Sequence, residues 1–275
     1  MTATTWSATI GQDRLTGAAR YWSLVRELSI TNFKLKYTGS ALGYVWSLVK
    51  PLAYFGVLYV IFVRFFKQRE NDFPLQLLLA VVVFTFFAEC TSAGLGSIAG
   101  NGHLIRKATF PLSALVIATS VTALFTFVIN LALVLLVALI AGKLGLSWRV
   151  LAVPPLLVEL YLLSLGVGMI LASVFVFFRD VGHIWEVISQ LLIYACGVVF
   201  PATLIPPGLR HVYFLDPLAQ NIEDLRHALI TPAAPWSITL TGAGIYAAAL
   251  GLSVACFVVG LVLFRWLAPS FAESL

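Results

Sequence analysis

The sequence predicts an all-α membrane protein with six transmembrane helices, an N-terminal amphipathic interfacial helix, and short re-entrant helices between spans five and six. Of the 275 residues, 60% are hydrophobic and only 11% are charged, whereas soluble domains carry about 25% charged residues. A membrane-spanning helix needs roughly 20 apolar residues, and the chain is rich enough in them to form several. This composition excludes a soluble enzyme, a disordered chain and a secreted disulfide scaffold.

The first expected element is an amphipathic helix over residues 18–37. One apolar stripe at helical spacing contains Tyr21, Leu24, Val25 and Leu28. The other side carries Arg20, Ser23, Arg26 and Glu27. Such a basic helix, with Trp22 as its aromatic residue, is expected to lie in the membrane interface. It either anchors the topology or acts as a gate. The gate would meet an anionic lipid headgroup through Arg26, Lys34, Lys36 and Tyr37.

Six apolar stretches follow the amphipathic segment. Hydropathy places the spans at about residues 44–66, 75–93, 112–141, 150–178, 184–204 and 238–264. The third and fourth approach 30 residues, about 45 Å of helix, so we expect them to tilt or protrude. Pro154 and Pro155 should break or kink the fourth span near its start. The chain therefore divides into a cytoplasmic N-terminal part, residues 1–43, and one transmembrane domain, residues 44–275.

The distribution of basic residues predicts the orientation. Residues 1–40 contain five Lys and Arg and no long apolar stretch, so we expect the amino end to stay in the cytoplasm. Of the 17 Lys and Arg residues, ten then fall on the inner side and seven on the outer side, in agreement with the positive-inside rule. Both termini are therefore expected in the cytoplasm, and the protein in the inner (plasma) membrane.

Residues 205–237, on the outer side, are too few for two further spans. Asp216 followed by Pro217 is typical of a helix start, and Thr231-Pro232 would end that helix. Its apolar face contains Leu218, Ile222, Leu225 and Leu229. Its polar face contains Glu223, Asp224, Arg226 and His227. We interpret this segment as short re-entrant helices that dip into the outer leaflet, with an ordinary surface helix as the alternative.

The sequence lacks the common signatures of catalysis. It contains no GxxxxGK[ST] phosphate loop and no HExxH, GxSxG or CxxC motif. The four histidines are dispersed, so we expect no metal site, no cofactor in this chain and no catalytic residue. We expect Glu89 and Glu186 to lie near the inner interface. Glu159, deeper in its span, could partner another helix. A conduit is the expected role, and the chain has no obvious energy source of its own.

Aromatic residues are frequent in the first span. Trp46, Tyr54 and Tyr59 are candidates for a channel wall, because sugar rings stack on aromatic faces. The alternative is that they face lipid or pack between helices, since aromatic belts at membrane interfaces use the same residue types.

Four motifs occur in a fixed order along residues 20–235. The first, basic-x-basic-Tyr-x-Gly-Ser-x-Leu-Gly-x-x-Trp-x-x-x-x-Pro, is matched by Lys34, Lys36, Tyr37, Gly39, Ser40, Leu42, Gly43, Trp46 and Pro51. The second, Asn-x-x-Leu-Ile-x-Lys-x-x-Phe-Pro, is matched by residues 101–111. The third is Phe-Arg-Asp-Val at 178–181, and the fourth combines Leu204-Ile-Pro206, Asp216-Pro217 and Arg226. Together they resemble the ABC-2 type permeases that export lipid-linked polysaccharides, the Wzm-like group. Asp216 departs from the usual Asn.

The resemblance implies the transmembrane half of an ABC exporter, not an enzyme. Two copies of this chain would pair, and two copies of a separate ATPase subunit would bind ATP and Mg²⁺. The cargo would be a polysaccharide on a polyprenyl-pyrophosphate lipid, with galactan suggested by likeness to the mycobacterial galactan permease. No nucleic-acid partner is expected.

The resemblance also implies where the ATPase binds. The coupling helix would contain His103, Leu104, Ile105, Arg106 and Lys107. The alternative for this stretch is a solvated connector. Arg179 and Asp180 would form a second cytoplasmic contact, although Asp180 can equally complement the dipole of the fifth span.

The sequence leaves three alternative functions. An ABC-2 exporter of a drug or small lipid is the nearest, and the aromatic first span and basic interfacial helix favour glycan over it. An ion-coupled secondary transporter predicts paired intramembrane charges and an internal repeat, and the sequence has neither. A membrane glycosyltransferase needs catalytic acids in a cytoplasmic loop, and these are absent.

Overall fold

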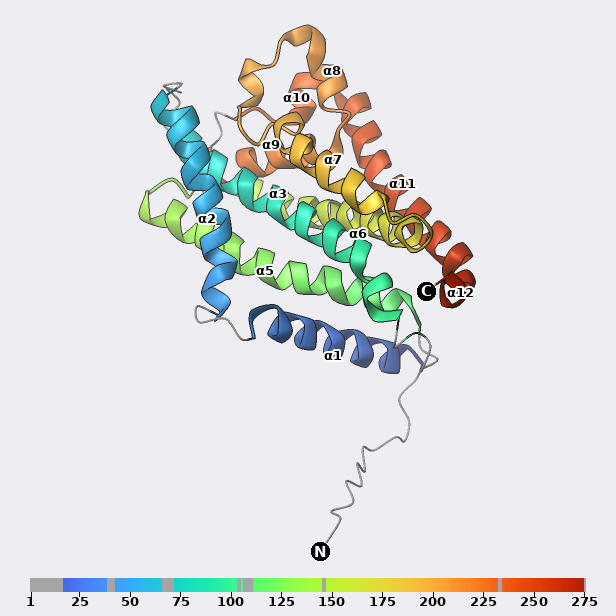
Figure 1. Cartoon of the computed structure of the whole chain (residues 1–275). Coiled ribbons are helices and arrows are strands. Elements are labelled where there is room, and N and C mark those ends of the chain that lie inside the picture. The colour runs from blue at the N-terminus through green and yellow to red at the C-terminus, as the bar shows by residue number, and fades with distance from the viewer. Residues whose placement is uncertain are drawn as a thin grey trace, which may run out of the picture.

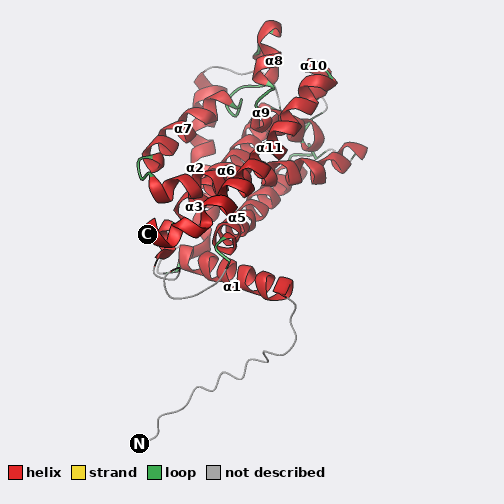
Figure 2. Ribbon diagram, turned by 90° about the vertical axis from the view of Figure 1, so that its right-hand side faces the viewer, coloured by secondary structure: helices red, strands yellow, loops and turns green. Residues whose placement is uncertain are grey.

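The computed structural model describes residues 17–38, 43–65, 72–102, 105, 111–144, 147–231 and 234–274. Every regular element within these ranges is a helix (Figures 1 and 2), which confirms the all-α class. Five of the described helices are long and apolar enough to cross a membrane. They are α2 (Trp46–Tyr59) together with the π-helical turn Val60–Phe65 that continues it, α3 (Phe73–Gly96), α5 (Ser113–Ile140), α6 (Val153–Phe177) with the short 3₁₀ turn before it, and α11 (Ala243–Leu267) with the short 3₁₀ turn after it. They correspond to the first, second, third, fourth and sixth expected spans.

The remaining expected span, residues 184–204, is not confirmed as one long helix. α7 (Val181–Ala195) has 15 residues, about 22 Å, which is shorter than the roughly 30 Å hydrocarbon core. The chain turns at Gly197, whose φ is +69°, and continues in short turns to α8 (Arg210–Tyr213). α7 nevertheless begins where α6 ends, and α11 begins at the opposite end of the bundle (Figure 1).

The N-terminal helix α1 (Gly17–Tyr37) packs along the first half of α5 and runs in the same direction (Figure 1). The Tyr21 hydroxyl lies 3.1 Å from Ser113 Oγ, and Ser29 Oγ donates to the Ala118 carbonyl at 3.2 Å. The expected apolar stripe is therefore the face that contacts α5. Its location at a membrane interface stays a prediction.

Helix α3 lies at the centre of the bundle, between α5, α6 and α2. Glycines allow the other helices to approach closely. A Cβ atom on Gly166 of α6 would lie 2.5 Å from the Phe257 Cα of α11, and one on Gly260 would collide with the Gly166 carbonyl oxygen. A Cβ atom on Gly94 of α3 would lie 3.0 Å from the Gly168 Cα of α6. Ala at these positions would separate the helices.

Two predicted features at helix α6 agree with the structure. A 3₁₀ turn (Trp148–Ala152) passes into α6 at the proline pair, which occupies the first turn of the helix. The missing N–H groups of proline cost little there. Glu159 is buried and accepts a hydrogen bond from Ser253 Oγ of α11 at 3.1 Å. Glu159 thus links α6 to α11, as predicted.

Helix α9 (Pro217–Leu229) is buried against α3, α6 and α11, so the alternative of a surface helix is wrong. The Asp216 side chain accepts from the Leu218 N–H at 3.0 Å and caps the helix as predicted. Asn221 Nδ2 donates to the Leu156 carbonyl of α6 at 2.8 Å. Even its polar side is covered, including Gln220, Asn221, Glu223, Asp224 and Arg226. A re-entrant position in the outer leaflet stays a prediction.

The buried Arg226 joins α9 to the turn after α7. Its guanidinium donates to the carbonyls of Gly197 and Val198 at 2.9 and 3.0 Å, and to that of Phe200 at 3.3 Å. It also pairs with Glu223 at 3.0 Å. Such a charge is tolerated in an interior because it is both paired and hydrogen-bonded.

The carboxyl end of the chain belongs to the bundle. α10 (Ser237–Thr241) precedes α11, with a break at Gly242, whose φ is +83°. After α11, the short helix α12 (Phe271–Ser274) places Phe271 in full burial, with its ring 5.4 Å from that of Phe264 and 6.1 Å from that of Phe177.

Candidate functional site

Polar side chains follow one face of α5. Thr119, Thr122, Thr126 and Asn130 occur at intervals of three or four residues, which places them on the same side of a helix. On α3, Thr85 and Glu89 lie on one face and line the same space as the α5 residues. α1 and α2 cover these two stripes. The space between the four helices contains two cavities, which together we call the polar groove.

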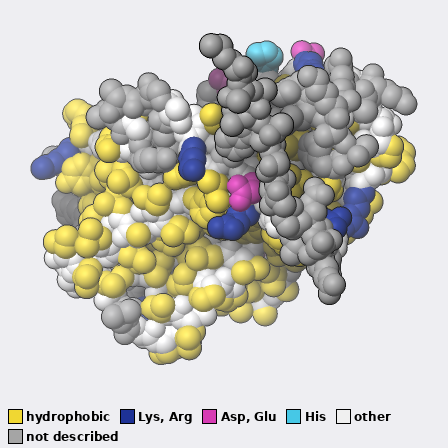
Figure 3. All heavy atoms as spheres, turned by 90° about the horizontal axis from the view of Figure 1, so that it is seen from below, with side chains coloured by type: hydrophobic (Ala, Val, Ile, Leu, Met, Phe, Trp, Pro, Cys, Tyr) yellow, Lys and Arg dark blue, Asp and Glu magenta, His cyan; other side chains and the backbone are white. Residues whose placement is uncertain are grey.

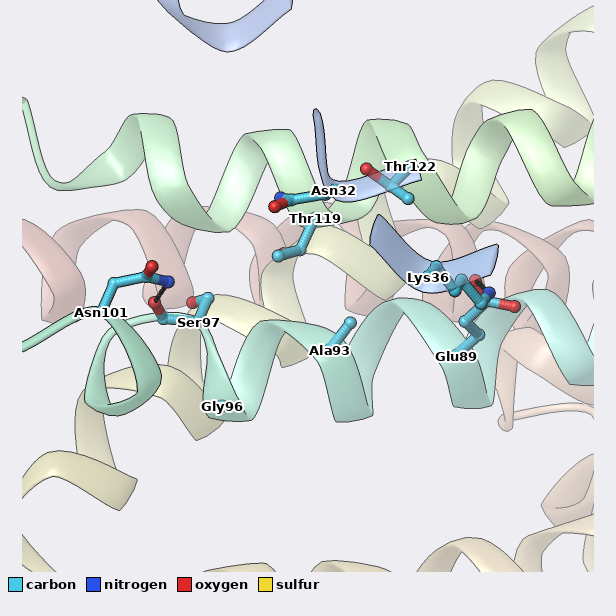
Figure 4. A pocket seen from close by; sticks show the side chains of 9 residues that line it. All are labelled: Asn32, Lys36, Glu89, Ala93, Gly96, Ser97, Asn101, Thr119 and Thr122. Atoms are coloured by element: carbon cyan, nitrogen blue, oxygen red, sulfur yellow. Dashed lines mark hydrogen bonds and ion pairs between the residues drawn. The ribbon is translucent and has the colours of Figure 1, made fainter. Parts of the chain in front are cut away.

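The first cavity of the polar groove measures about 300 Å³ and lies between α1, α3 and α5 (Figure 4). Its lining comprises Asn32, Lys36, Glu89, Ala93, Gly96, Ser97, Asn101, Thr119 and Thr122. Thr119 points from α5 toward α3, and the Asn101 amide points back to the end of α3, where its Nδ2 donates to the Ser97 carbonyl at 2.8 Å.

The second cavity measures about 230 Å³ and reaches α2. Its lining comprises Lys36, Trp46, Ser47, Lys50, Pro51, Thr85, Glu89, Thr126 and Asn130. Asn130 is 3% exposed, and its Oδ1 has no hydrogen-bond partner within the described ranges.

Lys36 and Glu89 form an ion pair that borders both cavities. The two side chains point toward each other from α1 and α3 (Figure 4). Thr126 Oγ1 lies a further 3.5 Å from Glu89 Oε1. Both partners remain partly accessible, with side-chain exposures of 33% and 23%. An anionic ligand could therefore reach the Lys36 ammonium, but it would compete with the Glu89 carboxylate.

The other expected headgroup residues do not join Lys36 in the polar groove. Arg26 and Lys34 are exposed on α1 and line neither cavity. The side chain of Tyr37 lies outside the described part of the structure. Viewed from the α1 side, the described surface is mainly apolar with scattered basic side chains (Figure 3).

The three expected channel residues of α2 lie in different surroundings. Trp46 is 39% exposed and lines the second cavity. Tyr54 is also 39% exposed and lines neither cavity. Tyr59 packs against the main core and lies 5.8 Å from the Phe55 ring. The three do not form one aromatic wall within a single chain.

Ile105 is the only described residue of the expected coupling segment; His103, Leu104, Arg106 and Lys107 lie outside the described residues. Ile105 is 9% exposed and packs in the apolar cluster that contains Ile98, Met169, Phe264 and Phe271. Its side chain therefore faces the bundle. An ATPase groove would have to be met by other residues of the segment.

Arg179 and Asp180 are exposed at the junction of α6 and α7. The Arg179 guanidinium lies 5.1 Å above the Phe175 ring. Asp180 occupies the N-cap position of α7, but its side chain makes no capping hydrogen bond there. The pair is accessible, as a contact site requires.

Sequence reasoning missed several residues of the polar groove. Glu89 was expected only as a hydrated acid, and Asn32, Lys50 and Asn130 were not singled out. The signal that could have found them is the polar period on the third span, Thr119 to Asn130, because four polar residues on one face of a membrane helix must point away from lipid. Within the described ranges, no group of three or more His, Cys, Asp and Glu could hold a metal ion.

Comparisons with known proteins are consistent across most of the chain. A family model described as ABC-2 type transporter matches residues 23–230. The O-antigen export system permease protein RfbA of Klebsiella pneumoniae is 25% identical over 249 residues, covering 90% of this chain and 93% of the relative. RfbA of Myxococcus xanthus is 27% identical over 186 residues, covering 68% and 71%. The polysialic acid transport protein KpsM of Escherichia coli is 22% identical over 252 residues, covering 88% and 92%.

Proposed function

Because this chain belongs to the ABC-2 type transporter family, we propose that it is the transmembrane subunit of an ATP-driven exporter of polysaccharide linked to a polyprenyl pyrophosphate. The observation that carries this proposal is the likeness, over about nine tenths of the chain, to permeases named for O-antigen and polysialic acid. Galactan is the first cargo to test. The polysaccharide moves from the cytoplasm to the outer side of the inner membrane.

The engine belongs to other subunits in this proposal. The sequence has no phosphate loop, so ATP and Mg²⁺ bind to two copies of a separate ATPase that dock on the cytoplasmic side. Residues 103–107 and the Arg179–Asp180 pair form that contact. Ile105, packed in the cluster with Phe264 and Phe271, ties the docking segment to α11 and α12, so that a push on the segment reaches the bundle.

Two copies of this chain form the conduit. Apolar side chains are exposed on α7, where Val187, Leu191 and Tyr194 are 58%, 64% and 56% exposed, and on α2, where Val57 is 58% exposed. A second copy packed on this face would place the channel between the two chains.

Six crossings complete the topology. α7 starts at the end of α6 and α11 starts at the opposite end of the bundle (Figure 1), which supports one further crossing between them. α7 with residues 196–204 makes that crossing. An even number of crossings leaves both termini on the same side of the membrane, which the positive-inside rule makes the cytoplasm. α1 then lies on the cytoplasmic half of the bundle, where Arg26, Lys34 and Lys36 meet the pyrophosphate headgroup.

Reconstitution tests the function directly. The chain is purified with its ATPase, placed in lipid nanodiscs, and its ATP hydrolysis is measured with decaprenyl-pyrophosphate-linked galactan oligosaccharide or with a small amphiphilic drug. We expect the lipid-linked glycan to stimulate hydrolysis and the drug to leave it unchanged. Stimulation by the drug alone would instead favour the second candidate within the family, an exporter of small lipids or drugs.

A further inference from the structure

Hydroxyl groups that line the polar groove donate their hydrogen atoms to backbone carbonyls of their own helices. In the first cavity, the Oγ–H groups of Ser97, Thr119 and Thr122 donate to carbonyls three or four residues earlier, at 2.6 to 2.8 Å. In the second cavity, Thr85 Oγ1 donates to the Val81 carbonyl at 2.7 Å. A hydroxyl that donates in this way still presents oxygen lone pairs to the cavity.

Asn130 repeats this pattern with an amide. Its Nδ2 donates to the Thr126 carbonyl at 2.9 Å, while its Oδ1 is buried and has no partner among the described residues. A buried amide oxygen left without a donor destabilises the folded chain. The Asn130 side chain also lines the second cavity, so a small rotation of the amide would let a donor bound there reach this oxygen.

The charges around the polar groove decide which kind of donor fits. A metal ion or an ammonium group would satisfy acceptor oxygens, but the Lys36 and Lys50 side chains line the same space and repel cations. The carboxylate of Glu89 does not offset both, because it is already paired with Lys36. A neutral group with several O–H donors satisfies the acceptors without meeting this repulsion, and a sugar ring is such a group.

We propose that the polar groove binds the sugar units adjacent to the lipid headgroup, whose hydroxyls donate to Asn130 Oδ1 and to the threonine oxygens of α3 and α5. This rests on the proposed function, and it adds a sugar-recognition site inside each chain, apart from the face that would meet a second copy. Cavities of about 300 and 230 Å³ are at or below the small end of ligand pockets, which suits one or two sugar units. Lys36 lies at the border of the two cavities, where it would contact the pyrophosphate that is attached to the bound sugar.

The experiment compares two probes on the chain reconstituted with its ATPase. One probe is decaprenyl pyrophosphate carrying a galactan oligosaccharide, and the other is decaprenyl pyrophosphate without sugar. The variants Thr119→Val and Asn130→Leu each remove an acceptor oxygen at nearly constant volume. We expect each to raise the half-stimulating concentration of the glycan-bearing probe about 2- to 10-fold, with that of the sugar-free probe unchanged.

Thr91→Val is the matched control. Thr91 lies on α3, is buried and donates to the Phe87 carbonyl at 2.8 Å, as the groove threonines do to their own helices, but it faces α6 and lines neither cavity. We expect it to leave both half-stimulating concentrations at the wild-type values. If Asn130→Leu prevents assembly with the ATPase, Thr119→Val carries the test, because Thr119 lines the other cavity of the groove.

The outcomes separate the two proposals. Equal half-stimulating concentrations in Thr119→Val and Thr91→Val would mean that the groove holds only ordered water, and the sugar site would be rejected. An equal rise for both probes would also reject it, because the groove would then recognise the headgroup. If neither probe stimulates the wild-type complex, it is the proposed export of lipid-linked glycan that fails.

Discussion

At single residues, the sequence indicates which side chains matter but not which partners they have in the folded chain. The motif that contains Lys36 singles out this lysine, but its partner Glu89 is 53 residues away, and the pair exists only because α1 lies across the α3–α5 contact. Arg226 is similar. It was assigned to a polar face, yet it is buried among three carbonyls of the turn after α7. Hydropathy treats a charge as exposed, and only tertiary packing supplies the partners that allow burial.

Removal of the Glu89 charge tests the role of Lys36. In Glu89→Gln the lysine loses an anionic competitor, and an ion pair of this accessibility is worth up to about 1 kcal/mol. We therefore expect the half-stimulating concentration of polyprenyl pyrophosphate to fall about 2- to 5-fold. Glu27→Gln, at an exposed position of α1, should leave it unchanged. A rise in Glu89→Gln would show that the pair supports the headgroup site.

Asp224 predicts a pH dependence of stability. Burial raises the pKa of this carboxyl from 3.8 to about 7, against the opposing effect of two hydrogen bonds from Ser237, and the nearby Glu223 and Glu159 raise it further. Because the folded pKa lies above the unfolded one, the stabilisation by the proton is complete below pH 3.8 and is lost as the pH rises through about 7.

The measurement is the thermal midpoint of the purified chain in detergent at about pH 5.5 and about pH 8.5. We expect the midpoint to be lower at the higher pH by on the order of 5 °C, and Asp224→Asn to reduce this difference. Asp180→Asn, at an exposed position, should retain it. An unchanged pH difference in Asp224→Asn would assign the effect to another group.

At the scale of elements, hydropathy predicted five long helices to within a few residues, because a run of apolar residues has few alternatives to a helix in a membrane. One long helix over 184–204 is not confirmed, because the apolar composition continues beyond Ala195 but the helix ends there and the backbone turns at Gly197. Hydropathy also could not show that α9 is covered on all sides, because the residues that cover it come from α3, α6 and α11. The apolar composition of a segment indicates the length of its helix, whereas the burial of that helix depends on which other helices pack against it.

The contact between α6 and α11 depends on two glycines. Gly166→Ala would place a methyl group 2.5 Å from the Phe257 Cα, and overpacking of this kind costs about 1–3 kcal/mol. We expect Gly166→Ala to lower the thermal midpoint, measured as the temperature at which half of the protein is lost from its size-exclusion peak after heating. Gly251→Ala on α11 has open space around the new methyl group and should be neutral or slightly stabilising. Equal loss in both variants would contradict the tight α6–α11 contact.

At the scale of the whole molecule, apolar faces are exposed on both α7 and α11, where lipid can cover either, and we assign the face of α7 to a second copy. Val187 on α7 is 58% exposed and Val262 on α11 is 60% exposed, so the two positions differ in location and not in accessibility. Each is changed to Cys in a chain whose three native cysteines are replaced by Ala, and a bifunctional maleimide is applied in membranes.

Paired copies related by a twofold axis bring the same surface of each chain together. We therefore expect Val187→Cys to give a cross-linked species of twice the chain mass, and Val262→Cys to remain at 29.9 kDa. The opposite pattern would place the contact on α11 and would move the channel to the other side of the molecule.

The burial of Phe271 has a practical consequence for fusion proteins. This ring shares an apolar cluster with Ile105, so a bulky domain attached directly after the last residue would pull on the anchor of the segment proposed to receive the ATPase stroke. Reporter and affinity domains at the carboxyl end therefore require a flexible spacer. A fused protein that exports poorly with a short spacer and normally with a long one would report on this linkage without any change to the chain itself.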